Sequence, residues 1–195
     1  MAWSRRKSAD GPAAGRSPSP GARSGPSRLR IRRARPADAP ALAAVRRAAV
    51  LDVPPGAFRR ADLAAWASLP PLYDLWAMTA GGEAILAAER AGRVVGFAGL
   101  RAAELTALFV APRAARRGVG AALIAAVERL ARRRGLRRLS VVAAASAVPF
   151  YLARGFAGRR RARVPLPGGR SLAAVRLAKR LPVPGRRPAV PPSRA

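Results

Sequence analysis

The sequence predicts a mixed α+β (α/β) domain built on a central, mostly antiparallel twisted sheet of about six to seven strands flanked by helices. Three segments in which apolar residues recur at helical spacing come after the first, fourth and fifth of the strand-like segments. Short stretches in which apolar residues alternate with polar ones or run without interruption predict the strands. These stretches lie at residues 29–33, 84–89, 94–100, 104–110, 139–143, 159–164 and 172–179.

Composition divides the chain into three parts. Residues 1–27 are basic and rich in Ser, Pro and Gly, and they are predicted to be a disordered tail. Residues 28–181 contain every periodic segment and are predicted to form one folded domain. Residues 182–195 return to Pro and Arg without pattern, which predicts a second disordered tail. Half of the 195 residues are hydrophobic, so one domain with a substantial core is expected.

The first half of the predicted domain begins with a strand and continues through helices. Asp38, followed by Pro40, is expected to cap the helix that carries Leu42 and Val45 on one face. Residues 61–67 predict a second, short helix. The segment 70–78 contains two aromatic residues, Tyr73 and Trp76. Its secondary structure is left open, as is the choice between a core role and a wall of an acceptor pocket.

The second half alternates strands with turns and two helices. Ala91-Gly92 predicts the turn of a hairpin between residues 84–89 and 94–100. The strand at 104–110 leads into a helix at 118–134 that Gly135 ends. A strand at 139–143 precedes a helix at 146–154, and a last hairpin turns at 167–169.

The absence of two residue types limits the chemistry. The chain has no cysteine and no histidine, which excludes disulfides, thiol nucleophiles and imidazole-dependent triads. No metal site is predicted, and acid–base chemistry must use carboxylates, tyrosine or lysine. No apolar run is long enough to span a bilayer, and Met1 to Lys7 leads into no hydrophobic segment, so we expect a cytoplasmic protein without a membrane partner.

The formal net charge of +29 would ordinarily indicate a polyanionic partner such as nucleic acid. Only Lys7 and Lys179 are lysine, and the many arginines accompany an excess of Ala, Gly and Pro, a pattern typical of a GC-rich genome. The charge is also spread along the chain rather than gathered in one block. Nucleic-acid binding is therefore kept as an alternative and is not the leading interpretation.

A strand, a glycine-bearing turn and a helix follow one another between Glu104 and Arg134, an order that suits phosphate binding. Gly118 and Gly120 would let the backbone approach a pyrophosphate, and the N–H groups from about Ala115 to Ala121 could point at its oxygens. Arg116 and Arg117 would add positive charge beside it.

Three segments together resemble the acyl-CoA-binding core of the GNAT superfamily of N-acetyltransferases. They are residues 108–112 (Leu-Phe-Val-Ala-Pro), residues 116–121 (Arg-Arg-Gly-Val-Gly-Ala), and residues 147–156, with the Pro149-Phe150-Tyr151 run and Gly155-Phe156. The resemblance implies direct transfer of an acetyl group from acetyl-CoA to a primary amine of a small molecule, peptide or protein. It implies cofactor contacts by Leu108, Phe109, Val110, Ala115, Arg116, Arg117, Gly118, Val119, Gly120, Ala121, Ser146 and Phe150.

The resemblance also implies two catalytic residues. Glu104 begins the strand before the glycine turn and is the candidate general base, with a plain hairpin-end carboxylate as the alternative. Tyr151 is the candidate acid that protonates the departing thiolate, with a buried structural tyrosine as the alternative. Ala115 stands where the family usually has Gln or Arg, and Ser146 stands where it usually has Asn. CoA binding is therefore expected to be weakened but retained.

The acceptor and the assembly are not specified by any motif. The strongly basic domain should repel polyamines, which favours a neutral or acidic small molecule or a peptide terminus. The alternative function is a non-catalytic basic module of the same fold that binds nucleic acid or the ribosome. A homodimer is one assembly that the sequence allows.

Overall fold

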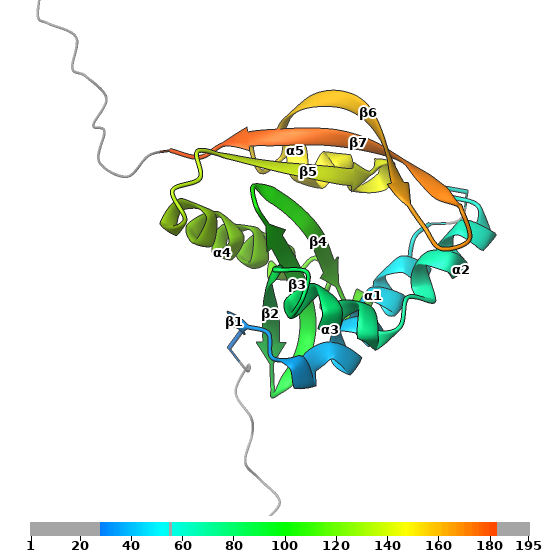
Figure 1. Ribbon diagram of the computed structural model, residues 1–195, viewed down its shortest axis with the longest axis horizontal. Helices are drawn as coiled ribbons and strands as arrows, with labels where there is room; N and C mark the ends of the chain where they lie inside the picture. Colours follow the sequence, from blue (N-terminus) through cyan, green and yellow to red (C-terminus); the bar gives the residue numbers. More distant parts are fainter. Residues whose placement is uncertain (1–27, 55, 183–195) are drawn as a thin grey trace, which may run out of the picture.

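A computed structural model of the chain describes residues 28–54 and 56–182 (Figure 1). The tails predicted at 1–27 and 182–195 lie outside the described residues except for Pro182. Within those residues, seven strands form one sheet in the order β1-β2-β3-β4-β5-β7-β6. The strands are β1 (Arg30–Arg33), β2 (Ala84–Arg90), β3 (Arg93–Arg101), β4 (Glu104–Val110), β5 (Arg138–Ala144), β6 (Ala157–Pro165) and β7 (Ser171–Arg180).

The pairing of these strands confirms the predicted fold class. Neighbours pair antiparallel throughout the sheet, with the exception of β4 and β5, which are parallel. The predicted hairpins are present, and Ala91 and Gly92 both take positive φ in the first of them, as a tight hairpin turn requires. The helix α4 (Val119–Arg133) supplies the long connection that the parallel pair needs.

The remaining helices include the segment 70–78, whose secondary structure the sequence leaves open. They are α1 (Ala39–Leu51), α2 (Arg60–Ala67), α3 (Pro71–Met78) and α5 (Val148–Leu152), with 3-10 turns η1 (Pro36–Asp38), η2 (Pro112–Ala114) and η3 (Ala145–Ala147). The segment 70–78 is thus mostly helical, with Pro71 in the tolerated first turn. The helix predicted at 146–154 is shorter, because residues 145–147 form a 3-10 turn and Gly155 takes φ +79°.

Apolar side chains form one core on each face of the sheet. The larger core lies under α4 and α5 and includes Leu105, Leu123, Leu139 and Phe156. The smaller core lies under α1 and α3 and is built around Leu42, Phe97 and their neighbours. Figure 1 shows α4 and the α1–α3 group on opposite sides of β2, β3 and β4. The alternating side chains of β4 therefore reach two different environments.

The parallel pair β4–β5 is short and opens into a fork. The two strands pair only at Glu104 with Ser140 and at Leu105 with Val141. A bulge between Gly99 and Leu100 shifts the β3–β4 register at the same level and leaves Thr106 as the extra residue of β4. Beyond Leu105, β4 separates from β5, and the two halves of the sheet diverge (Figure 1).

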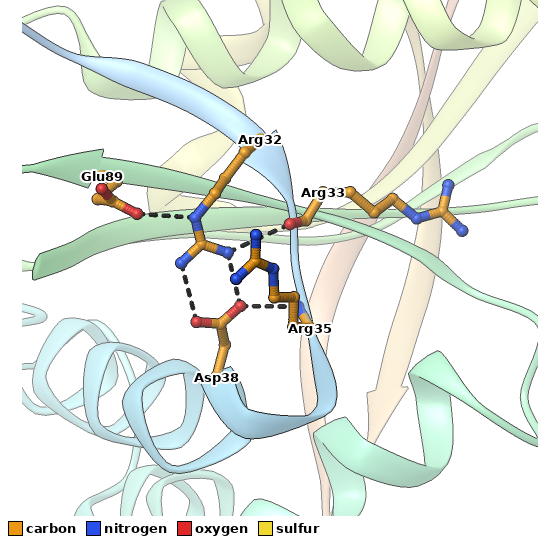
Figure 2. A network of polar contacts seen from close by, with 5 residues as sticks. All are labelled: Arg32, Arg33, Arg35, Asp38 and Glu89. Atoms are coloured by element: carbon orange, nitrogen blue, oxygen red, sulfur yellow. Dashed lines mark hydrogen bonds and ion pairs between the residues drawn. The ribbon is translucent and has the colours of Figure 1, made fainter. Parts of the chain in front are cut away.

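A charged network holds the start of the domain to the sheet (Figure 2). Arg32 donates from Nε to Glu89 (2.7 Å) and from Nη1 and Nη2 to Asp38 (2.7 and 2.9 Å). The sequence predicts Asp38 as the cap of α1, but its carboxylate makes no cap bond to that helix. It accepts instead from the backbone N–H of Arg35 at 2.7 Å and from Arg32, whose guanidinium holds the pKa of Asp38 below its ordinary value.

Candidate active site

A cleft of about 460 Å³ lies beside the glycine turn between β4, α4 and α5. The residues that line it are Leu108, Val110, Ala115, Arg116, Gly118, Val119, Gly120, Ala121, Ala147, Phe150, Tyr151 and Arg154. Two segments far apart in the sequence thus meet at one cavity, as the motif spacing predicts. Predicted site residues make up most of its wall.

The turn before α4 presents a cradle of backbone donors. From Arg116 to Ala121, no N–H group bonds to any acceptor in the described part of the chain, whereas the N–H of Ala115 bonds to Pro112 and that of Ala122 bonds to Gly118. Arg116 and Gly118 both have positive φ, +58° and +78°, which turns successive N–H groups toward one side. A left-handed arginine costs strain, which the rest of the turn must offset to hold Arg116 in this conformation.

Gly120 keeps the cleft open. A Cβ placed on Gly120 would lie 3.1 Å from the tip of the Phe150 ring, so a side chain there would have to displace the aromatic wall. Phe150 in turn lies under the guanidinium of Arg154, whose Cζ is 3.6 Å from the ring centroid, and Arg154 also donates to the Phe150 carbonyl at 2.9 Å. Sequence reasoning misses Arg154, because there it is one more basic residue before a helix-ending glycine.

Tyr151 is nearly buried at the wall of the cleft, with 5% of its surface exposed. Its ring packs edge-on against Phe150 and Phe156 at centroid distances of 5.3 and 5.4 Å. Burial raises the pKa of its hydroxyl well above the ordinary value. The phenol is therefore protonated across the physiological pH range, as a proton donor must be.

Comparison with known proteins decides the family. A GCN5-related N-acetyltransferase from Rhodopseudomonas palustris has the same fold with a TM-score of 0.73 and 32% identity, over 80% of this chain and 98% of that one. The chain belongs to the GNAT superfamily of acetyltransferases. The sequence model of the acetyltransferase (GNAT) domain matches residues 73–163 of it.

Two further GNAT structures were solved with their nucleotide cofactor. The PaiA N-acetyltransferase from Thermoplasma acidophilum, in complex with coenzyme A, gives a TM-score of 0.62 at 17% identity, over 78% of this chain and 99% of that one. YncA from Salmonella typhimurium, with its cofactor acetyl-CoA, gives 0.59 at 21% identity, over 83% and 99%. At these identities they support the fold alone. No match was found among curated proteins.

A second cavity of about 140 Å³ lies on the other face of β4 in this GNAT domain. Its walls come from α1, α2, α3, the start of β2, the β4–β5 fork and the end of β6. Aromatic rings form one side, with Trp66 edge-on to Phe109 at 5.7 Å and Phe97 at 5.3 Å from Phe109. Phe109, predicted to contact the cofactor, therefore directs its side chain to this second cavity.

The other predicted residues outside the cleft lining are Arg117, Ser146 and Glu104. Arg117 is exposed on the glycine turn, and Ser146 is exposed in η3. Glu104 stands at the first paired position of β4 and forms an ion pair with Arg176 at 3.5 Å. Its side chain is 40% exposed and lines neither the cleft nor the second cavity.

The described residues contain neither a membrane-spanning helix nor a cluster of metal ligands. None of the helices there is long and apolar enough to cross a membrane. Those same residues contain no cluster of three or more acidic side chains that could hold a metal ion.

Proposed function

We propose that this GNAT domain transfers an acetyl group from acetyl-CoA directly to a primary amine, through a ternary complex. The observation that carries the proposal is the run of unpaired N–H groups from Arg116 to Ala121, which opens into a cleft with Tyr151 on its wall. Unpaired amides at a helix start, with two arginines beside them, suit a diphosphate. The phenol suits a thiolate leaving group.

The residues fit coenzyme A without crowding. Gly118 has no atom within 4 Å of the position where a Cβ would lie, and Arg116 and Arg117 add charge at the same turn. Leu108 and Val110 form an apolar strip along β4, where the unpaired edge beyond the fork offers backbone groups to an extended ligand. When bound, acetyl-CoA supplies the thioester that an amine attacks.

Tyr151 is assigned the role of acid. It would give its proton to the thiolate as the carbon–sulfur bond breaks, and the raised pKa keeps that proton available. An amine acceptor must first lose a proton, because its ordinary pKa is about 10. Two carboxylates are candidates for the base that removes this proton. Glu104 is the one that the family resemblance implies, and Glu83 lines the second cavity together with Asp74, beside the point where β4 leaves β5.

The test is release of free thiol from acetyl-CoA in the presence of amines, amino acids and peptides with free N-termini. We expect thiol release that depends on the acceptor, with mass spectrometry showing an acetyl adduct on nitrogen. Salt-sensitive binding of duplex DNA by residues 28–181, without thiol release from any acceptor, would instead favour the basic binding module.

A further inference from the structure

We infer that the second cavity binds the acceptor as a primary ammonium on an otherwise uncharged, apolar body, and that Glu83 is the carboxylate that removes its proton. This inference rests on the proposed acetyl transfer and assigns its acceptor class and base. Glu83 immediately precedes β2 and is buried, with 8% of its surface exposed.

Glu83 is held at the fork between β4 and β5. Thr106 donates its hydroxyl hydrogen to Oε1 of Glu83, and Thr106 is the bulged residue that follows the last β4–β5 pair. The carboxylate therefore lies where β4 leaves β5. From that point the even-numbered residues Leu108 and Val110 face the cofactor cleft, and Ala107 and Phe109 face the second cavity.

The sheet makes room for this carboxylate. A Cβ at Gly99 on β3 would overlap Oε1 of Glu83 and would come within 2.6 Å of the Thr106 hydroxyl. A glycine at this position is thus a steric requirement of the buried acid. Burial is the main cause of the raised pKa of Glu83, and the Thr106 hydrogen bond opposes it.

A second carboxylate in the cavity also lacks a full set of partners. Asp74 on α3 is 3% exposed, and Arg46 on α1 donates to its Oδ1 at 2.5 Å, but its Oδ2 has no hydrogen-bond partner in the described residues. Leu69 accepts from the other end of the Arg46 guanidinium at 2.7 Å. A buried, unpartnered carboxylate oxygen indicates a donor that the protein itself does not provide.

The cavity carries a charge opposite in sign to that of the chain when both of its carboxylates are ionised, and burial raises the pKa of each. With Glu83 and Asp74 ionised, the single cation Arg46 leaves this cavity with a net charge of −1, counted as +1 − 2, inside a chain of +29. Such a cavity attracts one ammonium group. A second cationic group on the same molecule would have to lie at the basic surface outside, so a monoamine is favoured over a polyamine.

The size and walls of the cavity define the body of the acceptor. A volume of about 140 Å³ holds roughly five water-sized groups at the ~30 Å³ that a water occupies in the liquid. That is room for the ammonium and a short alkyl chain. Trp66, Tyr73 and Phe109 line the cavity and supply aromatic surface for the methylenes that follow the ammonium.

The proton balance of the step is complete. Glu83 takes one proton from the ammonium, and the neutral nitrogen forms the C–N bond as the C–S bond breaks. Tyr151 gives its proton to the thiolate, and the second proton lost by the nitrogen restores the phenol. Glu83 returns its proton to solvent, so one amide, one thiol and one proton result.

The experiment compares Glu83→Gln with Glu104→Gln in the full chain, using n-propylamine and n-butylamine as acceptors, putrescine as the dication and aniline as an amine already neutral at pH 7. We expect thiol release to be faster with the monoamines than with putrescine. E83Q should lower kcat/KM for the monoamines about 100-fold or more, the size typical of a general base. CoA affinity should be unchanged, and E104Q should change kcat/KM less than threefold.

Aniline distinguishes a catalytic role of Glu83 from a purely structural one. Because it needs no deprotonation before attack, E83Q should impair its acetylation far less than that of n-butylamine. An equal loss for both acceptors would assign Glu83 a structural role and overturn the inference, as would a wild-type rate in E83Q or a large loss in E104Q. If E83Q does not fold, Thr106→Val replaces it and should lower kcat for n-butylamine at unchanged CoA affinity; an unchanged kcat would overturn the inference.

Failure of the proposed function would look different. If the wild type releases no thiol with any amine, titration with n-butylamine still tests the cavity. Heat of binding that E83Q abolishes would uphold the acceptor site while removing the transfer reaction. No heat in either protein would overturn both.

Discussion

Replacing Tyr151 with Phe removes one hydroxyl from the wall of the cofactor cleft. That hydroxyl makes no hydrogen bond to the described residues, and the ring is held by Phe150 and Phe156, which the substitution does not touch. We therefore expect the free energy of unfolding at pH 7 to change by less than about 0.5 kcal/mol. The affinity for CoA should stay within about twofold.

Turnover should fall much further. Loss of a general acid typically costs at least about 100-fold in rate, or ~2.7 kcal/mol of activation free energy. Steady-state thiol release at saturating acetyl-CoA measures kcat, and titration with CoA measures affinity in the same preparation. A Tyr151→Phe enzyme with wild-type kcat would refute the acid role, and one with weakened CoA binding would show that the hydroxyl contacts the cofactor instead.

The raised pKa of Tyr151 also predicts how the stability of the domain changes at alkaline pH, which unfolding experiments can test. An unfolded tyrosine ionises near pH 10, whereas the buried phenol stays protonated to higher pH. The contribution of Tyr151 to stability is therefore unaffected below about pH 10 and is lost as pH rises above it. Tyr151→Phe should lose less stability than the wild type between about pH 10 and 11, measured by urea unfolding.

Three further substitutions test other parts of the fold. Gly120→Val should weaken CoA binding at least about tenfold by pushing Phe150 into the cleft, while Ala125→Val on the exposed face of α4 should not, by calorimetric titration. Arg154→Met should weaken CoA binding about two- to fivefold as a cation leaves the cleft wall, with a thermal midpoint within a few degrees of wild type. Arg32→Met should lower the free energy of unfolding by about 1–3 kcal/mol because the Asp38 carboxylate loses its charged donor. The wild-type advantage should be present at pH 7 and disappear as pH falls through the lowered pKa of Asp38, and an advantage that persists in acid would refute that assignment.

At moderately acidic pH, the wild-type enzyme should lose activity while it is still folded. Glu83 acts as a base only when ionised, so kcat/KM should fall as pH drops through its raised pKa. Asp74, Arg46 and Arg101 are the charged groups near it, and Thr106 is its hydrogen-bond donor. In E83Q, the profile with n-butylamine should lose the inflection that the wild type shows at this pKa.

The strands and the cofactor turn can be predicted from the sequence because both depend on short-range pattern. Apolar alternation defines β2 and β3, and the glycine spacing at Gly118 and Gly120 defines the turn before α4. The segment 70–78 cannot be assigned in this way, because its two prolines and two aromatic residues suit a helix or a loop equally well. The fold settles it, since Ala77 is buried in the core under α1.

Glu83 could not be recognised from its surroundings in the chain. It follows two glycines, a context typical of an exposed turn, and only the bulge opposite Gly99 buries it. Its partner Thr106 is 23 residues away. Asp38 stands at the N-cap position of α1 as predicted, but its carboxylate makes no bond to that helix, because a guanidinium from β1 reaches it. Helix-cap preference alone does not show that competing partner, although Arg32 is only six residues away.

The fork has one more consequence, for how the domain keeps its shape. With only two residue pairs joining β4 to β5, main-chain bonding cannot align the two half-sheets over the rest of their length. Side chains must do so: Leu105 from one half, Leu139 and Leu177 from the other, and Leu123 and Val127 from α4 belong to one continuous apolar cluster. In the proposed reaction, the angle at which thioester and amine meet would therefore depend on residues that touch neither, and conservative changes in that cluster would alter reaction geometry before they alter binding.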